Sequence, residues 1–227
     1  MELLSVGLAK SIWLFDINDL NPKGVMFIPD ALKWIAERYS FQKFPTSVTD
    51  FGESDQNATD PKGYVFKTGS FQMEDTSVLV NFAIYNDGIV ADTWASTEAS
   101  DIFLEELLRA AAIKFDLSLR PNTIRKKLYV SELIVRMDDL FGRIHPGLQK
   151  FNRTLDHLFE RHALPSYQLS GLVFSQDTSG ASYKPPGLMI ERKAGVSFME
   201  GRYWSKSPFT TTDHINALKE LEKTLTS

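Results

Sequence analysis

The stretch Ser11-Ile-Trp-Leu-Phe-Asp-Ile-Asn-Asp-Leu20 decides the expected fold, because a similar stretch recurs later in the chain. It aligns without a gap on Ser131-Glu-Leu-Ile-Val-Arg-Met-Asp-Asp-Leu140, 120 residues further along. Apolar residues fall at every second position in both stretches, and this period of two predicts a strand with one buried face. Self-similarity at a fixed spacing is typical of a duplicated structural unit.

The same order of elements is expected after each stretch. A helix begins near Pro29 in the first half and near Pro146 in the second, since proline is tolerated in the first helical turn. Each helix carries an apolar stripe at helical spacing that is expected to pack on the sheet. The stripes are Leu32, Ile35, Ala36 and Tyr39 in the first helix, and Leu148, Phe151, Leu155, Leu158 and Phe159 in the second. Alternating residues then predict a hairpin that turns at Asn86-Asp87-Gly88 and a second that turns at Lys193-Ala194-Gly195. A helix with a hydroxyl-rich start closes each half. Each half is therefore predicted as β-α-β-β-β-α.

The predicted fold class is α+β, an internal duplication of a βαβββα unit with largely antiparallel sheets and helices packed on one face. The first copy spans residues 1–117, with a polar insertion at about 52–76, and the second spans 118–227. Together they are expected to form one compact pseudo-twofold unit. Whether the two sheets join edge to edge or form separate lobes is left open, and a shared strand–helix order without duplication is the alternative.

Composition narrows the classes of function. The chain has 227 residues, 43% of them hydrophobic, a net charge of −4 and no cysteine. Disulfides, thiolate nucleophiles and cysteine-ligated metals are excluded. The mildly acidic balance makes nucleic acid an unlikely partner, because phosphate backbones require basic surfaces. No apolar run reaches the roughly 18–20 residues of a membrane span, so a cytoplasmic protein without membrane contact is expected.

Two tryptophans, Trp94 and Trp204, each follow a predicted returning strand and precede a closing helix. Paired aromatic residues at matching places could line a partner-binding surface. The alternative interpretation is that each tryptophan packs its closing helix onto the sheet.

Ile190-Glu191-Arg192-Lys193 contains the Glu-x-Lys element of restriction-endonuclease-like metal nucleases, and the surrounding α-β-β-β-α order also resembles their core. The resemblance implies a site of Asp177, Glu191 and Lys193, in which the two acids hold Mg²⁺ and the lysine steadies the attacking water or the phosphate. A solvated hairpin strand is the alternative. Outside this reading no cofactor and no metal site are predicted, and His214, near a helix start, is expected to be a capping or surface residue.

Two classes of function remain. The first is a non-catalytic protein-binding or assembly component, such as an adaptor or subunit of a larger bacterial or phage complex, with a protein partner or self-association. The alternative is a metal-dependent nuclease that uses the second copy alone. The two halves share their apolar faces but differ in the polar residues that would carry out chemistry, and this favours the first class.

Overall fold

A computed structural model describes residues 1–21, 28–50, 63–138, 140, 141, 144, 146–159, 167–177, 179 and 186–226. The helices and strands are β1 (Glu2–Leu14), α1 (Ile28–Arg38), β2 (Tyr64–Met73), β3 (Thr76–Tyr85), β4 (Gly88–Thr93), α2 (Thr97–Phe115), β5 (Lys126–Arg136), α3 (Pro146–Phe159), β6 (Gly171–Phe174), β7 (Leu188–Arg192), β8 (Arg202–Ser207) and α4 (Thr211–Thr226). Short 3₁₀ helices, η1 (Ile17–Leu20), η2 (Val48–Asp50) and η5 (Phe198–Glu200), lie in the connections.

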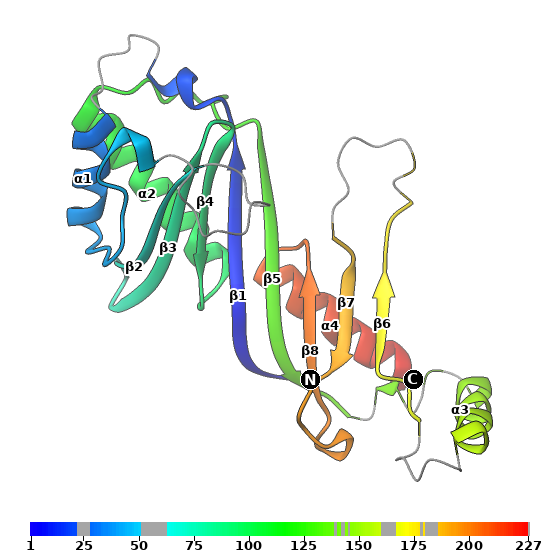
Figure 1. Cartoon of the computed structure of the whole chain (residues 1–227). Helices are drawn as coiled ribbons and strands as arrows, with labels where there is room; N and C mark the ends of the chain where they lie inside the picture. Colours follow the sequence, from blue (N-terminus) through cyan, green and yellow to red (C-terminus); the bar gives the residue numbers. More distant parts are fainter. Residues whose placement is uncertain are drawn as a thin grey trace. The chain divides into compact units, whose positions relative to one another are not determined.

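The strands hydrogen-bond in the order β2-β3-β4-β1-β5-β8-β7-β6 and form one antiparallel eight-stranded sheet (Figure 1). The α+β class and the antiparallel pairing are therefore confirmed. Contacts divide the chain into two units, and β1 and β5 contribute residues to both. The large unit contains Leu8–Ser131 and Phe209–Thr211, and the small unit contains Met1–Gly7, Glu132–Pro208 and Thr212–Ser227. The predicted copies, 1–117 and 118–227, were defined by sequence similarity, and the duplication stays a prediction.

Two strands begin earlier than the sequence pattern predicts. The strand expected from Ser11 begins at Glu2, and the one expected from Ser131 begins at Lys126. Ile17, which continues the alternating series of Trp13 and Phe15, lies in η1 instead of in the strand. Burial alternates along the whole of β1, but the more buried residues fall at even positions from Leu4 to Leu8 and at odd positions from Ala9 onward.

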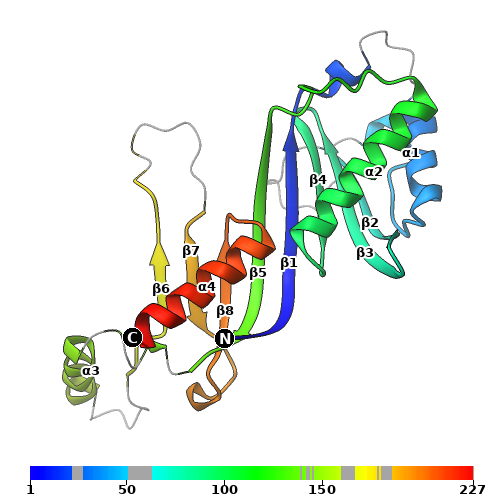
Figure 2. The ribbon, with the colours of Figure 1, turned by 180° about the vertical axis from the view of Figure 1, so that it is seen from behind.

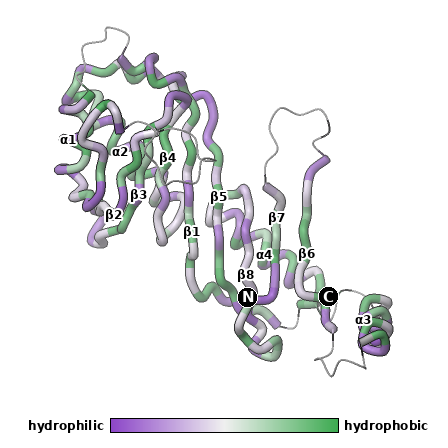
Figure 3. The backbone as a smooth tube through the Cα atoms, viewed as in Figure 1, coloured by the Kyte–Doolittle hydropathy of each residue, from purple (hydrophilic) through white to green (hydrophobic). Residues whose placement is uncertain are grey.

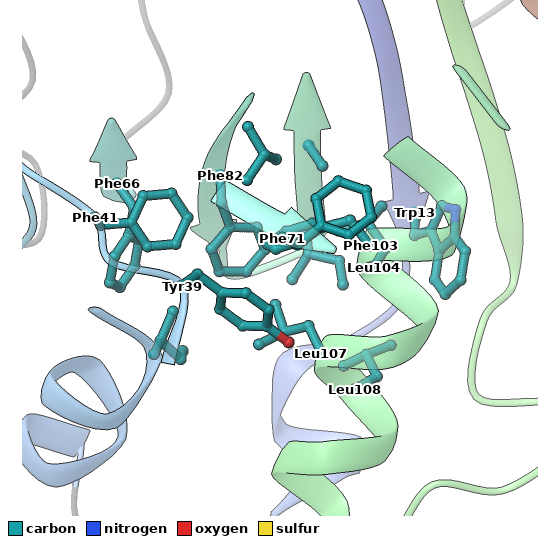
Figure 4. Packing of buried hydrophobic residues seen from close by; sticks show 14 of the residues in the cluster. Trp13, Tyr39, Phe41, Phe66, Phe71, Phe82, Phe103, Leu104, Leu107 and Leu108 are labelled. Carbon is teal, nitrogen blue, oxygen red and sulfur yellow. The ribbon is translucent and has the colours of Figure 1, made fainter. Parts of the chain in front are cut away.

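The core of the large unit is rich in aromatic side chains. Helices α1 and α2 cover one face of its strands, and Figure 2 shows α2 in front of β4 and β1. Phe103 of α2 is fully buried and contacts the rings of Tyr39, Phe71 and Phe82 at centroid distances of 4.9–5.7 Å (Figure 4). Offset and edge-to-face ring pairs of this kind add to the energy of apolar burial. The inward-facing residues of β2, β3 and β4 and the apolar residues of α1 and α2 therefore pack in one cluster.

The β3–β4 hairpin turns where the sequence predicts it. Tyr85 pairs with Gly88, which leaves Asn86 and Asp87 as the two-residue loop. Gly88 has a φ of 154°, and a Cβ atom at this position would lie 2.1 Å from the carbonyl oxygen of Trp13. Glycine is required here because β1 passes so close to the turn.

The outer edge of β2 is covered by the segment that follows α1. Lys43 and Lys67 exchange two backbone hydrogen bonds, at 3.3 and 2.8 Å, and Ser70 N donates to Tyr39 O. The strand bulges nearby, between Phe66 and Gly69. This short bridge and the bulge protect the edge of the sheet from pairing with another chain.

The N-termini of α2 and α4 cap one another. Thr97 N donates to Thr211 Oγ1 at 2.9 Å, and Thr211 N donates to Thr97 Oγ1 at 2.7 Å. Thr97 is fully buried and Thr211 is 5% exposed. Two backbone donors that no carbonyl of their own helices can satisfy therefore find acceptors in each other's side chains.

The small unit has its own apolar core. Leu218 of α4 packs against Leu133, Val135, Ile190 and Tyr203 of the sheet, and all five are fully buried. Figure 2 shows α4 in front of β8. The inward-facing residues of β5, β7 and β8 thus pack against the apolar side of α4.

His214 belongs to this buried layer, so the expectation that it is a capping or surface residue is wrong. It is fully buried on α4, and its Nε2 lies 2.8 Å from Ser205 Oγ. Ser205 Oγ donates its single hydrogen to Met189 O at 2.7 Å, so it accepts from Nε2–H of a neutral imidazole. Burial lowers the pKa of His214 to about 4.

Candidate functional site

The most unusual feature of the small unit is an amphipathic helix with an exposed apolar side. Leu148, Phe151, Leu155 and Leu158 of α3 are spaced three or four residues apart. At 3.6 residues per turn they fall within an arc of about 80° around the helix axis. We call these four residues the α3 stripe. Figure 3 shows hydrophobic and hydrophilic residues alternating along α3.

The α3 stripe is largely uncovered within the described part of the chain. Leu148, Phe151 and Leu158 are 38%, 56% and 67% exposed, and Leu155 is partly buried. The sequence predicts that this stripe packs on the sheet as that of α1 does, and this expectation is wrong. In α1 the corresponding apolar residues, such as Leu32 and Ile35, lie in the core of the large unit.

Three polar residues of α3 lie against the segment of its own unit that leads into β6. Asp156 Oδ1 accepts a hydrogen bond of 2.6 Å from Tyr167 N, in the segment that leads into β6. Gln149 and Asn152, together with Leu148 at the edge of the α3 stripe, line a hollow of about 190 Å³ with Leu169 on that same segment. Gln149, Asn152 and Asp156 are centred about 110° around the helix axis from the α3 stripe. The helix is thus anchored by one side and presents another, apolar side.

Strand β6, next to α3 in both views of the ribbon, is the last strand of the described sheet (Figures 1 and 2). Ser170 O accepts from Arg192 N on the β7 side, so strand alternation directs the backbone groups of Gly171 and Val173 outward. Val173 and Phe174 are 58% and 50% exposed. Among the strands that the structure describes, none pairs with this edge of β6. It therefore differs from the edge of β2, which is covered.

The residues of the predicted nuclease site lie apart along the β6–β7 pair. Glu191 is paired with Gly171 at the start of β6, whereas Asp177 lies beyond Phe174, at its other end. Three residues of strand span about 10 Å. Asp177 Oδ1 instead accepts from Ser179 N and Oγ, at 3.0 and 2.7 Å, and these hydrogen bonds lower the pKa of Asp177. Lys193 follows β7, and its backbone N donates to Arg202 O.

The two tryptophans occupy different structural positions. Trp94 lies three residues before α2 begins and is 52% exposed, whereas Trp204 lies within β8, seven residues before α4 begins. Trp204 alternates with the buried Tyr203 and Ser205, so it lies on the face of β8 opposite the one that α4 covers. The expectation that Trp204 packs α4 onto the sheet is therefore wrong. Their proposed partner-binding role stays a prediction.

Within the ranges that the structure describes, no group of three or more His, Asp or Glu residues could hold a metal ion, and no helix is long and apolar enough to cross a membrane. No protein-family model and no curated protein matches the chain.

Sequence reasoning identified the α3 stripe but not its exposure. Helical spacing shows that a helix has an apolar side, and by itself it cannot show whether that side meets the same chain. The polar anchors Gln149, Asn152 and Asp156 are the signal that could have been used, because they converge on one side of α3.

Proposed function

We propose that the protein is a non-catalytic, protein-binding component that docks a partner on the α3 stripe and the adjacent free edge of β6. The observation that carries this proposal is the exposure of the α3 stripe on a helix whose polar side faces its own unit. Covering a large apolar side chain contributes about 1.5–3 kcal/mol, so Phe151 and Leu158 are strong candidates for anchors of an interface.

The partner expected here is another protein with an extended apolar segment. The outward backbone groups of Gly171 and Val173 offer a strand partner both donors and acceptors. The exposed side chains of Val173, Phe174 and the α3 stripe offer apolar contacts beside them. In this proposal the chain acts in the cytoplasm as a subunit or adaptor of a larger complex, and a second copy of the chain is the alternative occupant.

Site-specific photocrosslinking tests the docking surface. A photoreactive amino acid placed at Phe151 is expected to crosslink a partner in the source cells, whereas the same group at Arg153, on the polar side of α3, is expected to give none. Light scattering on the purified chain distinguishes a second copy from a different protein. Equal crosslinking at both positions, or none at either, contradicts the proposal.

We also include the internal duplication in this proposal. Each half has the element order β-α-β-β-β-α, and the sheet order β2-β3-β4-β1 is mirrored by β5-β8-β7-β6. The reciprocal caps of Thr97 and Thr211, at equivalent helix starts, also support it. In this proposal α3 corresponds to α1. The apolar stripe of α1 packs inside its own unit, whereas the α3 stripe binds a partner.

The alternative, a Mg²⁺-dependent nuclease with Asp177, Glu191 and Lys193, has no comparable geometric support. Its direct test is a DNA and RNA cleavage assay with Mg²⁺ or Mn²⁺. Cleavage that Glu191→Ala abolishes would favour the nuclease over the binding component.

A further inference from the structure

The large unit contains an apolar cavity of about 400 Å³, which is independent of the α3 stripe and the β6 edge. Three elements form most of its walls. Leu32 and Ile35 come from α1, Leu107 and Ala111 from α2, and Ile84 and Ile89 from the β3–β4 hairpin. Its volume lies in the range of about 300–1,000 Å³ that is usual for small-molecule sites.

The chemistry of the cavity selects the kind of ligand. Apart from two asparagines and two tyrosines, every described residue that lines the cavity is apolar, and no Asp, Glu, Lys, Arg or His is among these described residues. Tyr64 Oη already donates to Val48 O, at 3.3 Å. A charged group inside would lose its hydration without gaining a partner, so the buried part of a ligand must be uncharged.

Polar groups gather at one end of the cavity. Asn18 and Asn86 are both exposed and also line the neighbouring hollow that contains Asp16, Asp87 and Arg125. The Asn18 amide donates to Asp16 Oδ1 at 3.0 Å, and the Asn86 side chain has no hydrogen bond within the described residues. These carboxamides supply a hydrogen-bond donor and an acceptor at the mouth.

The charges at this mouth disfavour an anionic head group. Arg125 is paired with Asp19 at 3.0 Å, and the described residues that line the adjoining hollow include two carboxylates, those of Asp16 and Asp87. A ligand carboxylate would meet like charges there, whereas a hydroxyl or carbonyl group would meet only hydrogen-bonding partners.

We infer that this cavity binds an uncharged, apolar small molecule that carries one hydroxyl or carbonyl group. The apolar body occupies the space between α1, α2 and the hairpin, and the polar group bonds to Asn18 or Asn86 at the mouth. This activity is separate from the proposed docking of a protein on the small unit, and either can fail without the other.

Binding to the full-length chain is measured with N-phenyl-1-naphthylamine, an uncharged probe whose fluorescence rises in apolar surroundings. Ala111→Phe fills the cavity from α2 and is expected to weaken probe binding at least tenfold. Ala112→Phe adds the same ring to the neighbouring position, which does not line the cavity, and is expected to leave binding unchanged. Ala31→Leu, from the α1 wall, is the second filling variant if Ala111→Phe does not fold.

Displacement of the probe identifies the head group. We expect 1-decanol to displace it and decanoate to do so much less well, because decanoate brings a carboxylate to Asp16 and Asp87. Asn86→Ala is expected to weaken displacement by decanol about 2- to 12-fold, the loss of one hydrogen bond. No probe binding, equal binding by the filling and control variants, or stronger displacement by decanoate would overturn the inference.

Discussion

His214 gives the small unit a defined sensitivity to acid. Its folded-state pKa of about 4 lies below the value of 6.5 for a free histidine, so the unfolded chain binds more protons between these two values. The free energy of unfolding is therefore expected to fall as the pH falls from 6.5 toward 4, by at most about 1.4 kcal/mol for each pH unit. Urea unfolding at pH 7.5, 6 and 5 measures this slope.

Two variants show whether His214 is the cause. His214→Leu keeps an apolar side chain in the buried layer and is expected to reduce the slope. His157→Gln, at an exposed position on α3, is the matched control and is expected to keep it. An unchanged slope in His214→Leu would assign the acid sensitivity to other groups.

Substitution of Gly88 and of Gly195 by alanine distinguishes the cost of backbone strain from the cost of a steric clash. Both have positive φ angles, 154° and 75°, but an added Cβ at Gly195 meets nothing within 4 Å. Gly195→Ala is expected to lower the free energy of unfolding by about 1–2 kcal/mol, the cost of the left-handed conformation. Gly88→Ala adds the clash with Trp13 O and is expected to cost clearly more. Equal losses in urea unfolding would show that β1 can move away from the turn.

At the scale of elements, the reciprocal caps couple two helix starts. Thr97→Val leaves the Thr211 N–H without its acceptor, and Thr211→Val does the same to Thr97 N–H. Each change is expected to cost about 1–3 kcal/mol in urea unfolding, since the orphaned donor is buried. The double variant is expected to differ from the sum of the single variants by at least about 0.5 kcal/mol. Thr154→Val, at an exposed site on α3, is the control for the loss of a hydroxyl, and strict additivity would contradict the coupling.

Helices α1 and α3 have similar apolar patterns, but substitutions in them are expected to have opposite consequences. Ile35→Ala on α1 creates a cavity in the core of the large unit and is expected to cost about 2–5 kcal/mol. Leu158→Ala on α3 removes a side chain that is 67% exposed, and it is expected to change the free energy of unfolding by less than about 0.5 kcal/mol. Urea unfolding of the isolated chain measures both. A large loss from Leu158→Ala would mean that α3 is covered in solution.

At the scale of the whole molecule, the two core clusters share no residue. Phe103→Ala is therefore expected to reduce hydrogen-exchange protection mainly in β2, β3 and β4, and Leu218→Ala mainly in β7 and β8. Each truncation removes a fully buried side chain, so both effects are large enough to measure. A uniform loss of protection in both variants would show that the two units open as one.

The sequence predicts most of this architecture, because each strand and helix carries its own period. The alternation from Ser77 to Tyr85 and the Asp-Gly turn locate β3 and the turn into β4 correctly. The basic run Arg125-Lys126-Lys127 leads into β5, and Lys127 Nζ lies 3.8 Å from the centre of the Trp13 ring. Long-range contacts of this kind leave no local pattern.

Position within an element is harder to predict than its type. The sequence comparison matches Trp94 with Trp204 because both are tryptophans. Trp94 lies three residues before the start of α2, and the residue three before the start of α4 is Pro208. The same limit applies to the candidate site. The α3 stripe was visible in the sequence, and its exposure depends on which side of α3 the rest of the unit contacts.

The division of β1 between the units has a consequence for biosynthesis. Met1–Gly7 belong to the small unit, whose remaining residues begin at Glu132. At about 5–20 residues per second, these first residues emerge on the order of 10 s before their partners are complete. The large unit therefore has time to fold while the start of β1 still lacks its neighbours. Translation speed after Ser131 sets how long that half-strand stays open to wrong pairing on the ribosome.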